Sequence, residues 1–120
     1  MKFIILCLVI CLTNGCAHSL SKDECSENKL FDIGKKMAYK GMKSSIFKKL
    51  RKSCKEHGID IKALTFQKGW FEGMKKFCTS QRGFHWGVVG RDNPRICTEE
   101  FKKDFERGYA RGKSLGKNRG

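Results

Sequence analysis

Cysteine and histidine are the residue types whose spacing could support specific chemistry, with seven cysteines and three histidines among 120 residues. Cys7, Cys11 and Cys16 lie in or just after an apolar N-terminal stretch. The other four cysteines form no CxxC pair, and no Cys or His has the spacing of a structural zinc site. An even set of four in an oxidising compartment predicts two disulfides rather than a metal site or a catalytic thiol. These four are Cys25, Cys54, Cys78 and Cys97.

The histidines could serve a hydrolase, because two imidazoles and a lysine can act as the general base, general acid and phosphate clamp of a nuclease. His57 stands directly before Gly58, where the end of a helix stabilises an imidazolium through the helix dipole. His85 lies between Phe84 and Trp86, in surroundings typical of packing or of surface exposure. We therefore expect no catalytic residue, no metal and no cofactor, and a small nuclease-like hydrolase is kept only as an alternative.

Residues 1–15 have the order of parts of a signal peptide. Lys2 supplies the positive start, the run from Phe3 to Leu12 is entirely apolar, and small residues surround Gly15. This run is too short to cross a hydrocarbon core about 30 Å thick, which needs roughly 20 apolar residues. The sequence therefore predicts an exported protein whose mature chain has no transmembrane helix.

Two cleavage sites compete at the end of this signal. Cleavage between Gly15 and Cys16 would make Cys16 the first residue and the site of lipidation, and the stretch from Leu12 to Cys16 is an imperfect lipobox. Ordinary cleavage after Ala17 is the alternative, and it would give a secreted protein. We expect lipidation at Cys16, followed by a tether over residues 16–21. Ala17 in place of an Asp resembles the sorting pattern of Gram-negative lipoproteins held in the outer membrane and facing the periplasm.

Positive charge dominates the chain, with 26 Lys and Arg against 12 Asp and Glu and a formal net charge of +14. A field of this strength attracts polyanions or anionic lipid surfaces, although it can also serve only to keep a domain soluble. The expected partners are the membrane, through the lipid, and an acidic envelope component: anionic lipid, lipopolysaccharide or an acidic protein. Nucleic acid and the oligomeric state remain open. Nine basic residues with no Asp or Glu between them are the candidate anion-binding residues: Lys35, Lys36, Lys40, Lys43, Lys48, Lys49, Arg51, Lys52 and Lys55.

Apolar residues over 22–116 recur at intervals of three and four rather than two, which predicts a single all-α domain of four or five short helices. A frayed tail over 117–120 follows it. Trp70 falls on an apolar helical stripe, whereas Trp86 is a candidate for a surface contact with bases or sugars. The predicted helices run from Ser21 to Gly41, from Ser44 or Ser45 to His57, from an N-cap at Asp60 to Cys78, from an N-cap at Thr79 or Ser80, and from Thr98 onward.

A weak glycine repeat runs through these helices. FQKGWFEG (66–73) and FERGYARG (105–112) share an aromatic residue, a Gly-aromatic step and a second Gly, and FDIG (31–34) and FHWGVVG (84–90) are fainter copies. Each glycine inside a helix costs roughly 0.5–1 kcal/mol relative to Ala. The repeat therefore predicts close helix crossings, in which the missing Cβ lets an aromatic ring lie against the backbone.

The helix order favours one disulfide pairing among the three that four cysteines allow. Cys25 opens the first predicted helix and Cys54 closes the second, so the two cysteines meet if these helices form an antiparallel hairpin. Cys78 ends the third helix and Cys97 precedes the last. We therefore expect the pairs Cys25–Cys54 and Cys78–Cys97.

An ordered series of glycines and cysteines over residues 25–112 resembles domain-of-unknown-function family 2799, a family of small proteobacterial lipoproteins. Lys29, Leu30 and Phe31 depart from the acidic, Trp-containing helix start expected in that family, and this chain is more basic. The resemblance implies export and lipidation and supplies no activity. It rests on Ile33-Gly34, Gly41, Cys54, His57-Gly58, Gly69, Gly73, Phe77-Cys78, Gly87, Gly90, Cys97 and Gly108.

The sequence thus predicts a non-catalytic binding or structural component of the cell envelope, with a strongly basic surface and a lipid anchor. The main alternative is a freely secreted basic effector that acts on nucleic acid or on membranes.

Overall fold

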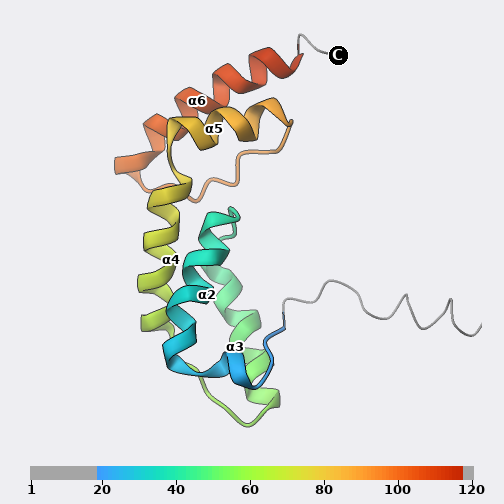
Figure 1. Ribbon diagram of the computed structural model, residues 1–120, viewed down its shortest axis with the longest axis vertical. Helices are drawn as coiled ribbons and strands as arrows, with labels where there is room; N and C mark the ends of the chain where they lie inside the picture. The colour runs from blue at the N-terminus through green and yellow to red at the C-terminus, as the bar shows by residue number, and fades with distance from the viewer. Residues whose placement is uncertain (1–18, 118–120) are drawn as a thin grey trace, which may run out of the picture.

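The computed structural model describes residues 19–117, and this part of the chain forms five α-helices and two short 3-10 helices without a β-strand (Figure 1). The all-α prediction is confirmed. The predicted signal peptide over 1–15, the predicted lipidation site Cys16 and residues 118–120 of the predicted tail lie outside the described residues, whereas Lys117, the first residue of that tail, still belongs to the last helix. No helix within 19–117 is both long and apolar enough to span a membrane. The elements are η1 (Asp23–Cys25), α2 (Glu27–Tyr39), η2 (Ser44–Ile46), α3 (Phe47–Glu56), α4 (Ala63–Phe77), α5 (Ser80–Val88) and α6 (Glu99–Lys117).

The helices are arranged as two pairs, α2 with α4 and α5 with α6, and α3 lies beside the first pair (Figure 1). The first pair is parallel, because Phe31 of α2 meets Gly69 of α4, and Lys35 one turn later meets Gly73 one turn later. The second pair has the same direction: Gly108 and Gly112 of α6 meet the backbone of α5 at successive turns. Parallel neighbours require a connection that returns along the pair, and α3 provides this connection in the first pair.

The glycines bring the paired helices into backbone contact. A Cβ at Gly69 would overlap the carbonyl oxygen of Phe31, and a Cβ at Gly108 would overlap that of Ser80. Such crossings allow Cα–H groups to approach partner carbonyls, a weak but recurrent interaction. The predicted close crossings are therefore present, but the neighbour is backbone rather than an aromatic ring. Gly41 is the exception, because its Cβ would lie 3.3 Å from both the Phe77 and Trp86 rings.

The two pairs are structural copies of one another. Gly34 packs on the Phe66 carbonyl and the Trp70 amide, and Gly83 packs in the same way on the backbone of Phe105 and Tyr109. The predicted match of 66–73 with 105–112 therefore agrees with the packing. Gly83 of α5 thus occupies the position equivalent to Gly34 of α2.

Both predicted disulfides are confirmed, with Cα–Cα distances of 5.7 Å for Cys25–Cys54 and 5.7 Å for Cys78–Cys97. Each bond joins the chain ahead of the first helix of a pair to the connection that leads to the second helix. Disulfides constrain the unfolded chain most effectively when they close such loops. The disulfides are thus a second element of the structural repeat.

Two hydrophobic clusters form the core, and the second also includes Ala38, Met74 and Phe77 of the first pair. In the first, Leu50 of α3 is grouped with Leu30 of α2 and Phe66 of α4, and all three are fully buried. In the second, the Phe77 ring lies 5.0 Å from both the Phe105 and Trp86 rings.

Trp86 belongs to this second cluster. Its side chain is 8% exposed, and its indole N–H donates to the Asp92 carbonyl over 2.9 Å. The expected role of Trp86 as a surface contact is therefore wrong, because the ring fills the core next to Phe77.

Candidate anion-binding surface

Helix α3 separates its residues into an apolar face and a basic face. Leu50, Ser53 and Cys54 are buried, as the helical spacing of three and four requires. Glu56 is the one acidic residue of this helix. The exposed residues of α3 are Glu56 and the five predicted cations Lys48, Lys49, Arg51, Lys52 and Lys55.

Arg51 differs from its neighbours because it is paired with an acidic group. Its Nε donates to Asp60 Oδ1 over 2.9 Å, and its Nη2 donates to Asp60 Oδ2 over 3.3 Å. This hydrogen bonding lowers the pKa of Asp60 and raises the pKa of Arg51. Asp60 is therefore not the helix N-cap that the sequence predicted, and α4 begins at Ala63 instead. The unpaired cations of α3 are its four lysines.

The N-terminal segment is attached to the end of α3. Leu20 is 5% exposed, its amide donates to Ser53 Oγ over 2.9 Å, and Ser53 Oγ donates back to the Leu20 carbonyl over 3.2 Å. The same carbonyl accepts a hydrogen bond from His57 Nε2 over 3.1 Å. Leu20 is therefore packed on α3, although it falls within the stretch 16–21 that the sequence predicted to be a tether. These contacts place Leu20 beside the basic helix α3.

The remaining candidate lysines fall in a different place. Lys35 and Lys36 project from α2 into a hollow along the seam with α4, where Lys76 joins them. Lys40 is the C-cap of α2 and Lys43 precedes η2, and both are exposed at the turn between α2 and α3. The nine predicted residues thus lie in three neighbouring parts of the fold, with five on α3, two on α2 along the seam and two at the turn between α2 and α3.

Lys76 is the residue that sequence analysis missed. It lies on α4, outside the basic stretch, and only the parallel pairing of α2 with α4 brings it to Lys35. The glycines at 34, 69 and 73 carried the signal for this pairing, since they mark the two faces in contact. Register between helices distant in sequence, however, does not follow from spacing within either one.

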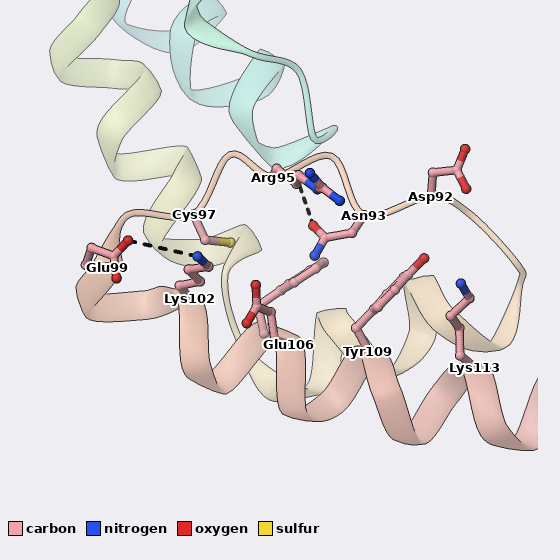
Figure 2. A pocket seen from close by; sticks show the side chains of 10 residues that line it. Asp92, Asn93, Arg95, Cys97, Glu99, Lys102, Glu106, Tyr109 and Lys113 are labelled. Carbon is pink, nitrogen blue, oxygen red and sulfur yellow. Dashed lines mark hydrogen bonds and ion pairs between the residues drawn. The ribbon is translucent and has the colours of Figure 1, made fainter.

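A second hollow lies between α6 and the segment that precedes it, with a volume of about 680 Å³ (Figure 2). Its walls carry both signs of charge, including Glu106 and Lys113, and Glu99 pairs with Lys102 over 4.0 Å. The Tyr109 hydroxyl in its wall donates to the Arg91 carbonyl over 2.6 Å. Because its charges are balanced locally, this hollow is a weaker candidate for an anion than the seam of the first pair.

The histidines do not share a site. His57 ends α3 in the first helix pair and is bound to the Leu20 carbonyl, whereas His85 is exposed on α5 of the second pair. Within residues 19–117, no three His, Cys, Asp or Glu side chains are grouped as metal ligands.

Residues 29–114 match the family model described as "Protein of unknown function (DUF2799)". The match begins in α2 and ends in α6, so it includes both helix pairs. The family resemblance expected from the glycine and cysteine series is confirmed. No curated protein and no solved structure matches the chain.

Proposed function

The chain belongs to this DUF2799 family of unknown function, and from that premise we propose that it is a lipid-anchored envelope protein whose basic helix α3 binds an anionic lipid surface. The observation that carries the proposal is the attachment of Leu20 to α3 through Ser53 and His57. The tether leaves the domain beside α3, whose exposed cations are opposed by a single acidic residue of that helix, Glu56. A lipid at Cys16 and the basic face of α3 therefore act on the same membrane.

The length of the tether supports this geometry. Three residues lie between Cys16 and Leu20, and a fully extended chain over these four residue-to-residue steps spans at most about 14 Å. This reach exceeds only slightly the distance of about 10 Å over which exposed charges act at 0.1 M salt. Lysines on α3 are thus held within or close to the range of an anionic headgroup layer. The basic face of α3 would add electrostatic attraction to anionic lipid to the anchoring that the acyl chains supply.

The first test measures vesicle binding by the mature chain that begins at Ala17 and carries no lipid. We expect it to bind vesicles rich in phosphatidylglycerol and to release them as salt rises, because screening weakens exposed charges. Each lysine near an anionic surface contributes roughly a fivefold gain in affinity. The triple substitution Lys48→Gln, Lys52→Gln and Lys55→Gln should therefore weaken binding by about a hundredfold.

The matched control removes the same charge from the second helix pair. Lys102→Gln, Lys103→Gln and Arg107→Gln lower the net charge equally, but they lie on α6, away from the N-terminal attachment. We expect this variant to lose less than about tenfold, through the long-range field alone. Equal losses in the two variants, or no binding by the parent chain at low salt, would contradict the proposal. Urea unfolding of both variants checks that their folds are equally stable.

A further inference from the structure

Two shallow hollows follow one another along the seam between α2 and α4. The first, of about 590 Å³, is lined mainly by Phe31, Leu64 and Phe71, with Gln67, Lys68 and Glu72 at its edges. Leu64 is 63% exposed and Phe71 is 43% exposed. Large apolar side chains grouped on a surface mark interaction sites more often than scattered ones do. This end of the seam therefore suits an apolar group.

The second hollow, of about 470 Å³, is cationic. Lys35, Lys36 and Lys76 line it, with Gly73 and Tyr39 beside them, and Asp32 is the one acidic residue in the lining. Lys35 lowers the pKa of Lys76, first through side-chain hydrogen bonding and then through charge repulsion. The nearby Glu72 carboxylate forms an ion pair with Lys75, with 2.8 Å between Oε1 and Nζ. Three lysines against one aspartate in the lining give this hollow a net positive charge, which is suited to a divalent anion such as a phosphate.

The order of the hollows follows from the parallel pairing. On α2 the apolar Phe31 precedes Lys35 by one turn, and on α4 Leu64 and Phe71 precede Lys76. Both helices therefore place their apolar residues toward one end of the seam and their lysines toward the other. The twelve residues from Leu64 to Lys76 correspond to about 18 Å of helix. One elongated ligand with an apolar tail and a charged head can occupy both hollows.

We propose that this seam binds an anionic lipid with a single acyl chain, whose phosphate lies between Lys35 and Lys76 and whose chain lies along Phe31, Leu64 and Phe71. Lysine ammonium groups bind phosphate as point charges, and Lys36 adds a third. Burial of the chain against exposed apolar side chains supplies the hydrophobic part of the affinity. The proposal deepens the proposed function, because it rests on the same preference for anionic lipid and names one class of it.

The second helix pair shows how specific this arrangement is. When the two pairs are aligned on their equivalent glycines, Phe84 of α5 corresponds to Lys35 and Leu115 of α6 corresponds to Lys76. These two line the corresponding hollow together with Arg111, which lies over the Phe84 ring at 5.7 Å. The second seam therefore has one cation where the first has three. A phosphate head is expected at the first seam only.

The test is calorimetric titration of the full mature chain with dodecyl phosphate, kept below its micelle concentration. We expect one site per chain and much weaker binding of inorganic phosphate, which lacks the tail, and of dodecyl maltoside, which lacks the charge. Lys35→Gln with Lys76→Gln should weaken dodecyl phosphate binding by about tenfold or more. Phe71→Ser should weaken dodecyl phosphate and leave inorganic phosphate unchanged.

The control variant Lys48→Gln with Lys52→Gln removes the same charge from α3 and should bind dodecyl phosphate as the parent does. An equal loss in the two double variants, or dodecyl phosphate binding no tighter than dodecyl maltoside, would overturn the proposal. The failures of the two proposals are distinguishable. If the α3 variants lose vesicle binding but the parent chain has no dodecyl phosphate site, the lipid site at the seam is rejected and the proposed function is kept. A dodecyl phosphate site without vesicle binding rejects the proposed function.

Discussion

Gly69→Ala should lower the free energy of unfolding by about 3 kcal/mol or more, which is large against the 5–15 kcal/mol total of a typical domain. The added methyl would overlap the carbonyl oxygen of Phe31 and crowd its carbonyl carbon and Cα. These are backbone atoms of α2, so a rotamer change cannot relieve the overlap and the two helices must move apart. Equilibrium unfolding in urea of the unreduced protein measures the change.

Two further variants separate this effect from the general cost of replacing glycine. Gly108→Ala should match Gly69→Ala, because its methyl would overlap the Ser80 carbonyl in the equivalent crossing. Gly58→Ala has nothing within 4 Å of its methyl, and its cost is the left-handed backbone at φ +76°, about 1 kcal/mol. If Gly69→Ala were no more harmful than Gly58→Ala, the backbone contact of the two helices would be wrong.

Removal of either disulfide should cost about 3–4 kcal/mol in the chain-entropy model. The Cys25–Cys54 bond spans 29 residues and the Cys78–Cys97 bond spans 19, and loop entropy depends only weakly on length. We therefore expect the double variants Cys25→Ala/Cys54→Ala and Cys78→Ala/Cys97→Ala to lose similar stability. A domain of about 100 residues buries too little surface to absorb such a loss easily.

Urea unfolding of the two double variants and of the parent, each with and without a reducing agent, measures these contributions. Reduction should destabilise each double variant further, since one bond remains in it. A variant with the stability of the parent would show that the missing bond constrains nothing. Single Cys→Ala variants are not suitable controls, because each would leave a free thiol able to form the wrong bond.

The elements that follow from local chemistry were predictable from sequence. Thr79 caps α5 by accepting from the Arg82 amide over 3.2 Å, as the sequence indicates. Gly41 and Gly58 end α2 and α3 with positive φ values, as glycines after helices commonly do. The disulfide pairing also followed, because the order of helix ends constrains which cysteines can meet. These features depend on residues close together in the chain or on simple topology.

The features that the sequence did not reveal depend on register between distant helices. Asp60 has the residue type of an N-cap, but its pairing with Arg51 leaves that role unused. Trp86 stands in a segment of mixed polarity and is buried because Phe77 of another helix packs against it. Lys76 joins Lys35 only because α2 and α4 are parallel partners. In each case a contact with a residue distant in sequence determines the role, the burial or the neighbour of the side chain, and the local sequence does not.

The most direct test of the lipid-anchored proposal is the intact mass of the protein, extracted from the membranes of a Gram-negative host, before and after reduction. We expect a chain that begins at Cys16 and carries two or three acyl chains, and that gains the mass of four hydrogens when its two disulfides are reduced. A chain that begins at His18, carries no acyl group and appears in the culture medium would contradict the anchor. It would instead favour the secreted basic effector.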